Sequence, residues 1–199
     1  MLKDKIEISL EEELPVSGEY TDENISELKL NGGEFEEVVF RNCVFENCEF
    51  IKTSFYNVRL EKCSFKSCKF TSSYWRDSVL SDVKADGCSF NDSVFKGVEI
   101  EKGSYCYTDF SQVLWENVSI DGSLFNYAFL SELKIKKLKI NSVNFSNVDF
   151  FRTSLKGLDF SNCSIEGIRV SDSYYELKGM KVSPAQAMEL VLLLGVKIK

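Results

Sequence analysis

The chain contains no histidine, which removes the side chain most often used for proton transfer near neutral pH. It also has no glycine-rich phosphate loop, and none of its cysteines has a histidine to activate it as a nucleophile. The first residues, MLKDKIE, do not form the apolar segment of a secretion signal, and no apolar run is long enough to cross a bilayer. We therefore expect a cytoplasmic protein that is not an enzyme, needs no cofactor, binds no metal and contacts no membrane.

What the chain has in abundance is a five-residue period. From Phe35 to Tyr175, every fifth residue is apolar or aromatic without a break. A second series, two residues earlier in each repeat and beginning Val38, Cys43, Cys48, contains only small or aliphatic residues and no charge. Each repeat therefore offers two side chains suited to a core.

This period fits neither ordinary secondary structure. Apolar positions recur about every 3.6 residues on a helix and about every 2 on a strand, so a period of five would drift around either. The residues two places after each apolar position, such as Asn42, Asn47 and Asp82, are types that tolerate tight turns. The chain must therefore turn after every repeat. Four short sides make a square coil of about 20 residues, and such coils stack at about 4.8 Å.

Six of the seven cysteines occupy the small inward position of the repeat: Cys43, Cys48, Cys63, Cys68, Cys88 and Cys163. Valine, serine and threonine fill the same position elsewhere, so we interpret these thiols as packing residues in a reducing compartment. An alternative is that Cys48, Cys68 and Cys88, which should stack on one another, bind a metal or form a disulfide. The absence of histidine and of charged groups around these positions favours packing.

With these features the chain resembles the pentapeptide repeat proteins. Their pattern is a small residue, a polar residue, leucine or phenylalanine, a polar residue and a turn residue, as in Cys48-Glu49-Phe50-Ile51-Lys52. The resemblance implies an all-β fold, a right-handed quadrilateral parallel β-helix, here over residues 28–180. It is most similar to the quinolone-resistance group of the Qnr and MfpA type. Some members of that group carry projecting loops, whereas no insertion disturbs the register of this chain.

The two ends of the chain lie outside the clear repeat. Residues 1–27 are predicted to cap the first coil, because an open solenoid end exposes strand edges and core side chains. Within this cap, Ile6-Glu7-Ile8-Ser9-Leu10 alternates as a β-strand does. Residues 181–199 are predicted to form a short helix and then a strand over residues 196–199.

The helix near the C-terminus has clear boundaries in the sequence. Ser183 is placed as N-cap with Pro184 in the first turn and Gln186 set for a capping box, and Gly195 ends the helix. The helix is apolar nearly all round, so covering the last coil uses only one side of it. In the quinolone-resistance group such a tail joins two copies, which implies a homodimer through the C-terminus; a one-sided cap is the alternative. The residues expected in the dimer interface are Ala187, Met188, Leu190, Val191, Leu192 and Leu194.

Charge is unevenly distributed along the chain. Residues 1–34 carry a net charge of −7, equal to that of the whole chain, residues 76–132 carry −6, and residues 133–170 carry +4. A solvated surface of mixed charge is one interpretation. The other is that the acidic middle binds a basic partner, through Asp77, Asp82, Asp86, Asp92, Glu99, Glu101, Asp109, Glu116 and Asp121. A smaller apolar contact patch is expected from Leu114, Leu124, Phe129 and Phe151, which occupy outward positions.

The family resemblance implies a specific function. A dimeric rod of this shape imitates duplex DNA, binds a type II topoisomerase (DNA gyrase or topoisomerase IV) without binding nucleic acid itself, and protects the enzyme from fluoroquinolones. Complementary charge would make that binding weaken as salt rises. The alternatives are a structural or protein-interaction scaffold with another partner, and immunity against a gyrase-poisoning peptide. The dimerising tail favours the topoisomerase interpretation.

Overall fold

From Glu37 to Gly157, the backbone turns at the end of every repeat through a residue with positive φ. Asn42, with φ of 53°, and Asp82, also with 53°, are of the types expected at such turns. Lys52 and Tyr107 adopt the same left-handed conformation, with φ of 53° and 58°. Stacking between coils therefore imposes the turn even on residues that seldom adopt it in isolation. The predicted turn is confirmed at every repeat between residues 37 and 157, and Asn162 does not share the left-handed conformation.

Short strands connect these turns. The computed structural model describes residues 2–197. Its elements are α1 (Leu2–Glu11), β1 (Val16–Thr21), β2 (Asn24–Ser26), β3 (Lys29–Asn31), β4 (Glu34–Arg41), β5 (Val44–Glu46), β6 (Glu49–Ile51), β7 (Ser54–Tyr56), β8 (Arg59–Glu61), β9 (Ser64–Lys66), β10 (Tyr74–Arg76), β11 (Val79–Ser81), β12 (Val94–Lys96), β13 (Glu99–Glu101), β14 (Leu114–Asp121), β15 (Lys134–Asn141), the 3₁₀-helix η1 (Tyr175–Leu177) and α2 (Pro184–Leu193).

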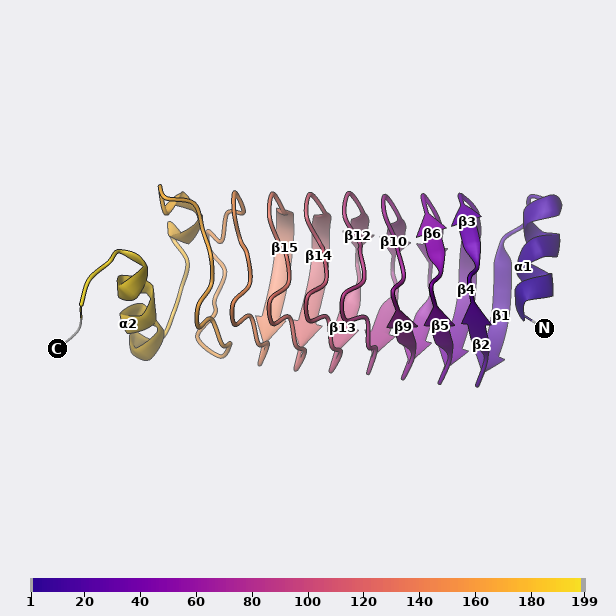
Figure 1. Ribbon diagram of the computed structural model, residues 1–199, viewed down its shortest axis with the longest axis horizontal. Helices are drawn as coiled ribbons and strands as arrows, with labels where there is room; N and C mark the ends of the chain where they lie inside the picture. Colours follow the sequence, from indigo (N-terminus) through magenta and orange to yellow (C-terminus); the bar gives the residue numbers. More distant parts are fainter. Residues whose placement is uncertain (1, 198–199) are drawn as a thin grey trace.

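The strands pair in parallel with the equivalent strands of neighbouring coils. Phe35 lies opposite Phe55, and Trp75 lies opposite Phe95. The long sheet β1-β4-β7-β10-β12-β14-β13-β11-β8, with β15 added to β14, covers two sides, while β2-β5-β9 and β3-β6 lie on the other two. The coils stack into an elongated rod with a helix at each end (Figure 1). The chain is a right-handed quadrilateral parallel β-helix, as predicted.

We number the four faces in chain order and identify each by its ladder of inward side chains. Face 1 carries Phe35, Phe55, Trp75, Phe95, Trp115 and Ile135; face 2 carries Phe40, Leu60, Leu80, Ile100, Ile120 and Ile140; face 3 carries Phe45, Phe65, Ala85, Tyr105, Phe125 and Phe145; face 4 carries Phe50, Phe70, Phe90, Phe110, Leu130 and Phe150.

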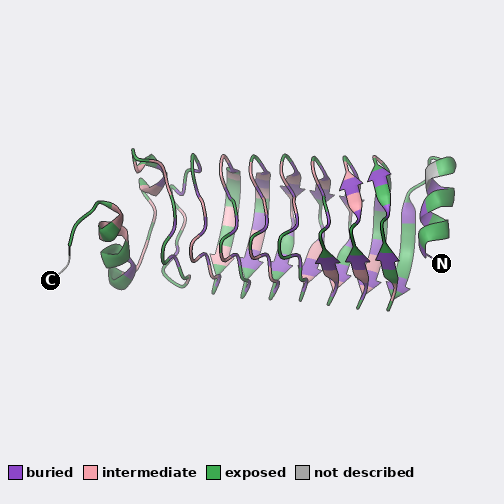
Figure 2. Cartoon of the chain, in the orientation of Figure 1, coloured by how far each residue is buried: buried purple, intermediate pink, exposed green. Residues whose placement is uncertain are grey.

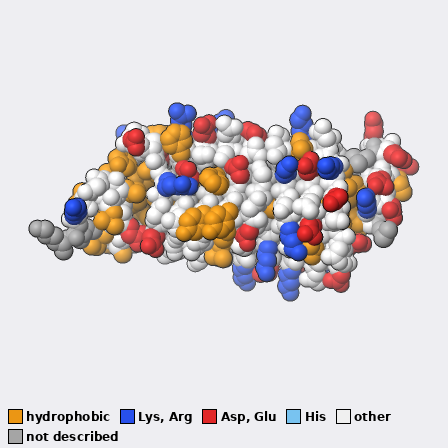
Figure 3. All heavy atoms as spheres, viewed as in Figure 1, with side chains coloured by type: hydrophobic (Ala, Val, Ile, Leu, Met, Phe, Trp, Pro, Cys, Tyr) orange, Lys and Arg blue, Asp and Glu red, His pale blue; other side chains and the backbone are white. Residues whose placement is uncertain are grey.

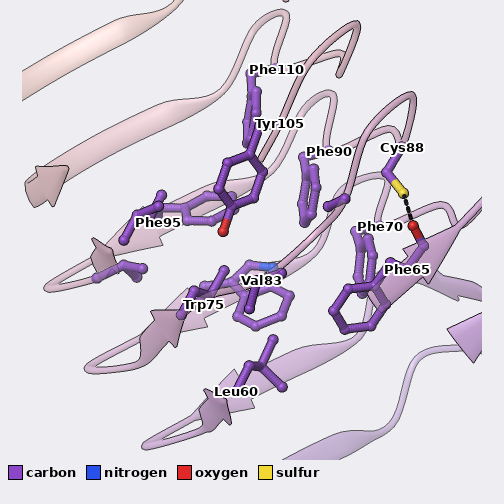
Figure 4. Packing of buried hydrophobic residues seen from close by; sticks show 14 of the residues in the cluster. Leu60, Phe65, Phe70, Trp75, Val83, Cys88, Phe90, Phe95, Tyr105 and Phe110 are labelled. Atoms are coloured by element: carbon purple, nitrogen blue, oxygen red, sulfur yellow. Dashed lines mark hydrogen bonds between the residues drawn. The ribbon is translucent and has the colours of Figure 1, made fainter. Parts of the chain in front are cut away.

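Stacked aromatic rings fill the interior. The rings of Phe70 and Phe90 lie 4.6 Å apart and 3° from parallel, an arrangement that adds about 1 kcal/mol per pair to the burial of the rings. The small inward residues satisfy the carbonyls of the coil before them: the Cys88 thiol donates to Phe65 O at 3.5 Å (Figure 4). Burial raises the pKa of Cys88 to about 11. All seven cysteines are free thiols, and six of them have the packing role predicted.

The N-terminal segment forms helix α1, and the strand predicted over residues 6–10 is wrong. Leu2 and Ile6, one helical turn apart, are buried against the first coil, whereas Ile8 is 54% exposed. The apolar side chains therefore follow helical rather than alternating spacing. The coils themselves begin with β1, so stacked structure extends into residues 1–27, which the sequence suggested were a cap only.

At the other end the period fails at Tyr175. This residue was predicted to point inward, but its side chain is 46% exposed and Glu176 is buried instead. The Glu176 carboxylate accepts hydrogen bonds from the Arg152 N–H at 2.9 Å, the Ser171 N–H at 3.2 Å and the Ser171 hydroxyl at 2.9 Å. Burial alone would raise the pKa of this carboxyl, but the hydrogen bonds outweigh it and the pKa is lowered. The inward position predicted for Tyr175 is wrong because the chain enters η1 here and leaves the square coil.

Candidate partner-binding surfaces

The nine carboxylates predicted to contact a partner are distributed over all four faces. Glu116 lies on face 1, Asp86 on face 3 and Asp109 on face 4; Glu99, Glu101 and Asp121 lie on face 2; Asp77, Asp82 and Asp92 occupy corners with positive φ. A rod with four sides cannot present all of these groups to one partner. The structure therefore does not bring the nine predicted residues together into one site.

Two of the nine carboxylates form ion pairs with their neighbours. Asp77 lies 3.2 Å from the Arg76 Nε. Glu116 lies between two lysines of adjacent coils, 3.8 Å from Lys96 Nζ and 3.7 Å from Lys136 Nζ. Pairs of this kind at the surface contribute little stability, up to about 1 kcal/mol, but they reduce the negative charge available to a partner.

Four more of the nine accept hydrogen bonds from neutral groups. The acceptors and donors are Asp86 with Ser104 Oγ (2.6 Å) and Cys106 N (2.7 Å), Asp92 with Asn91 Nδ2 (2.9 Å), Asp109 with Ser111 N (2.8 Å), and Asp121 with Asn141 Nδ2 (2.6 Å). These bonds occupy part of the hydrogen-bonding capacity of the four carboxylates.

The remaining three, Asp82, Glu99 and Glu101, are exposed, and within the described part of the chain their carboxylates form no hydrogen bond or ion pair. They lie together on face 2 and its following corner, and Glu101 is stacked directly on Asp121 of the next coil. We call Asp82, Glu99, Glu101 and Asp121 the acidic strip. Arg59 and Lys139 align with Glu99 across the coils, two coils before it and two coils after it, so basic side chains flank the strip at either end.

A second exposed feature is aromatic and lies on faces 3 and 4. The rings of Tyr107 and Tyr127 stack at 5.0 Å and 5° from parallel, with 60% and 45% of each residue exposed. Leu124, Phe129 and Phe151 are also exposed, at 45%, 42% and 40%. Hydrophobic side chains gather near the middle of this side of the rod (Figure 3). We call these five residues the aromatic patch.

The aromatic patch differs in two ways from the predicted one. Leu114, which was expected in it, is half-buried in β14 on face 1 and so lies on another side of the rod. Tyr107 and Tyr127 belong to the patch but were not predicted in it. Their separation of one coil is the signal that would have joined them, because residues one coil apart stack.

Helix α2 closes the C-terminal end as its sequence predicts. The Ser183 hydroxyl accepts from the Gln186 N–H, and Gln186 Oε1 accepts from the Ser183 N–H at 2.7 Å, which completes the capping box. The Gln186 side chain also donates to Phe160 O at 2.8 Å and Cys163 O at 2.6 Å, which fixes the helix to the last coils. Leu190 and Leu193 pack against the core.

The outer side of α2 is apolar and exposed. Met188, Leu192 and Leu194 are 54%, 55% and 58% exposed (Figure 2). Of the residues expected in a dimer interface, these three and the exposed Ala187 are free for a partner, Val191 is half-buried and Leu190 already contacts the protein's own core. The predicted strand after the helix is not present at Val196 and Lys197, and residues 198–199 lie outside the described residues.

Side chains fill the interior between Phe35 and Trp75 closely. Beside the stacked rings between Phe35 and Trp75, the free space is about 10 Å³, which is at most the room for one water molecule. Among residues 2–197, no group of three or more histidine, cysteine, aspartate or glutamate side chains is arranged to hold a metal ion. No helix in this range is long and apolar enough to span a bilayer.

Two family models and several solved structures match the chain. A family model described as pentapeptide repeats matches residues 138–167, and a model of the SV2A/B/C luminal domain matches residues 2–95. Full-length QnrB1, described as a plasmid-mediated fluoroquinolone resistance protein, superposes with a TM-score of 0.58 and 19% identity over 90% of this chain and 100% of QnrB1. The pentapeptide repeat protein Rfr23 from the cyanobacterium Cyanothece 51142 gives a TM-score of 0.44 and 9% identity, over 92% of this chain and 100% of Rfr23.

No curated protein sequence matches the chain. The repeat and the stacked square coils form the solenoid of the pentapeptide repeat fold, and the pentapeptide repeat model matches within it. The fold of the chain is like that of QnrB1.

Proposed function

We propose that this protein is a rod that mimics duplex DNA, binds a type II topoisomerase (DNA gyrase or topoisomerase IV) and protects it from fluoroquinolones. The proposal is supported by the fold it shares with QnrB1, a fluoroquinolone resistance protein. Because fold alone does not determine function, the surface must supply the rest of the argument.

The acidic strip is the observation that carries the proposal. Glu99 and Glu101 lie on the same short strand, so both carboxylates point outward beside each other. Since neither is paired within the described chain, a lysine or arginine of a partner can bind them without first breaking an ion pair. Glu116, which already lies near two lysines, is a poorer contact. We therefore place the partner contact on face 2 and not on the whole acidic middle.

A homodimer through α2 completes the proposal. Met188, Leu192 and Leu194 form an apolar surface at one tip of the rod, and a second copy docked there would double its length. Coils repeat at about 4.8 Å, so the dimer would present a long surface to an enzyme that binds duplex DNA. The proposed partner is in the cytoplasm, and the proposal assigns the protein to that compartment.

The test is a supercoiling assay with DNA gyrase, ciprofloxacin and increasing amounts of the protein at low salt. We expect supercoiling to be restored, and the restoration to weaken as salt rises. The variant Asp82→Asn/Glu99→Gln/Glu101→Gln should need about tenfold more protein for the same rescue. No rescue by the wild-type protein with either gyrase or topoisomerase IV would reject the proposal.

A matched control separates the strip from net charge. The variant Asp92→Asn/Asp109→Asn/Glu132→Gln removes the same number of negative charges from face 4 and its corner. We expect it to rescue as the wild type does. Equal loss in both triple variants would mean that overall charge matters and the acidic strip does not.

The aromatic patch favours a second candidate function, a scaffold that binds another protein. The stacked pair Tyr107 and Tyr127 is large, rigid and exposed, properties common among the side chains that dominate protein interfaces. The variant Tyr107→Ser/Tyr127→Ser discriminates between the two functions. If gyrase rescue survives this change but fails in the acidic-strip variant, the topoisomerase contact lies on face 2.

A further inference from the structure

Strand β15 is hydrogen-bonded on one side only. Its whole length pairs with β14, from Leu114 opposite Lys134 to Asp121 opposite Asn141. The preceding strands of face 1, β7, β10, β12 and β14, each pair on both sides. On the far side of β15, no backbone hydrogen bond joins residues 134–141 to residues 154–161, all of which are described. The solenoid therefore contains an open strand edge before its C-terminal end.

The missing bonds follow from a change in pairing. Residues 155–160 bond to the final segment of the chain: the Leu155 N–H donates to Glu176 O at 3.0 Å and the Phe160 N–H to Lys181 O at 2.9 Å. On face 3, the same two coils remain joined, with the Phe145 N–H donating to Ser164 O at 2.8 Å. The coils thus separate on faces 1 and 2 while they stay closed on faces 3 and 4.

Specific backbone groups are left free at this edge. In earlier coils the corner residue of face 1 donates to the next coil: Asp77 N–H to Lys96 O and Gly97 N–H to Glu116 O, both at 2.9 Å. Lys137 occupies the same corner, yet within the described chain its N–H has no acceptor. An exposed strand edge of this kind pairs readily with another extended chain.

The separation opens a groove of about 620 Å³ along the edge. Its floor includes Ile135, Leu138 and Leu158, which are only half-buried, whereas the equivalent Trp115 of the coil before is 1% exposed. In Figure 2, β15 is drawn as intermediate and exposed, unlike the strands before it, which carry buried residues. The groove thus offers an apolar floor as well as a polar edge.

The rim of the groove is positively charged. Lys134, Lys137 and Lys156 line it and form no ion pair with any described residue, and Arg152 shares its charge with Glu132 at 3.5 Å. No acidic residue lines the groove. Three unpaired lysines around an extended apolar slot favour a ligand that is negatively charged and itself extended.

We propose that this groove binds an extended acidic segment of a partner protein, which adds a strand to β15. The backbone of the segment would pair with the free edge at Ile135 and Lys137. Alternate side chains would then lie against the floor, and the intervening acidic ones would reach Lys134 and Lys156. A free phosphate or other small anion uses neither the open edge nor the apolar floor. This site is separate from the acidic strip and does not depend on binding to a topoisomerase.

Fluorescence anisotropy tests the proposal with a short fluorescein-labelled peptide that alternates glutamate and valine. We expect saturable binding to the full-length protein, and at least a tenfold rise in Kd for Lys134→Glu/Lys137→Glu. The control Lys136→Glu/Lys139→Glu makes the same charge change on the same strand, but neither residue lines the groove. It should bind within about twofold of the wild type. Equal loss in both variants would show attraction by net charge and overturn the site.

Two further probes separate strand addition from simple anion binding. The same peptide with N-methylated alternate amides cannot donate to β15, and we expect it to bind at least tenfold more weakly. Binding as tight as that of the unmodified peptide would overturn strand addition. Inorganic phosphate should not displace the labelled peptide at equal charge concentration, and full displacement would identify an anion site instead. If the wild type binds no peptide but self-associates, and the Lys134→Glu/Lys137→Glu variant does not self-associate, the groove binds a second copy of the chain and the proposal is overturned.

Discussion

The indole nitrogen of Trp75 donates a hydrogen bond to Ser73 Oγ at 2.9 Å inside the solenoid. Trp115 occupies the same inward position two coils later, but the residue equivalent to Ser73 is Val113. The indole N–H of Trp115 is buried and has no partner in the described chain. The two tryptophans therefore test what one inward hydroxyl contributes.

The substitution Val113→Thr should stabilise the protein. Threonine keeps the shape of valine, and its hydroxyl can accept from the Trp115 N–H while donating to a carbonyl of the preceding coil, as Thr108 does to Ala85 O at 2.8 Å. We expect the free energy of unfolding to rise by about 1 kcal/mol. Urea denaturation measures it, with Val118→Thr as the control because no indole lies two residues after Val118. A gain no larger than that of the control would contradict this account.

Tyr105 is a second buried residue whose polar group, here a hydroxyl, has no hydrogen-bond partner in the described chain. The residue is fully buried, its hydroxyl oxygen has no partner among the described residues, and in Figure 4 it points among apolar side chains. Burial raises the pKa of Tyr105, and the nearby Cys88 thiol raises it further. Tyr105→Phe should therefore leave the melting temperature unchanged or raise it, since an unmade buried hydrogen bond costs about 1 to 3 kcal/mol.

The matched control for that change is Tyr20→Phe. The Tyr20 hydroxyl donates to Ser17 O at 2.8 Å, so its removal discards a bond that is made. We expect this variant to lose about 1 kcal/mol of stability by thermal denaturation. If Tyr105→Phe destabilises as much as Tyr20→Phe, then the Tyr105 hydroxyl has a partner in solution.

Glu176 should make the C-terminal coil sensitive to acid. Its folded pKa is lowered, so the stability it contributes is present at neutral pH and is lost as pH falls through the folded pKa. Glu176→Gln removes the charge that holds three donors, and we expect a loss of about 1 to 3 kcal/mol at pH 7. The gap between wild type and variant should shrink below about pH 4, in urea melts taken across pH. A difference in stability that stays constant down to acid pH would contradict a role for the ionised Glu176 carboxylate. Glu166→Gln, which removes an exposed carboxylate, is the control for net charge.

The five-residue period predicts most of the fold because it specifies both the inward side chains and the turns. The same period also indicates which charged side chains on the surface are neighbours, which a count of charges along the chain does not show. Arg41 bonds Glu61 at 2.9 Å, and Lys69 bonds Glu49 at 3.1 Å, in each case one coil apart. Reading outward residues in steps of one coil would have shown Glu116 between Lys96 and Lys136, and Glu99 between the uncharged Val79 and Ser119.

The features that sequence did not predict lie where the chain leaves the period. Helix α1 was missed because Ile6 and Ile8 fit an alternating pattern as well as a helical one over so short a segment. The open edge of β15 was missed because the repeat continues through Leu155 and Phe160 without interruption. Only the competing bonds to Glu176 and Lys181 show that this coil pairs with the C-terminal segment and not with β15.

The proposed homodimer depends on the outer side of α2. Met188 and Leu192 lie one helical turn apart, both more than half exposed, and neither is part of the protein's own core. Met188→Glu/Leu192→Glu should abolish a dimer because an acidic pair buried in an apolar contact would lose its hydration, while glutamate preserves the helix. Light scattering after gel filtration should give a dimer for the wild type and a monomer for the variant, with unchanged circular dichroism. Ile8→Glu places a charge on an equally exposed apolar residue of α1 and should remain dimeric. A wild-type protein that is monomeric at every concentration would assign α2 the role of a one-sided cap.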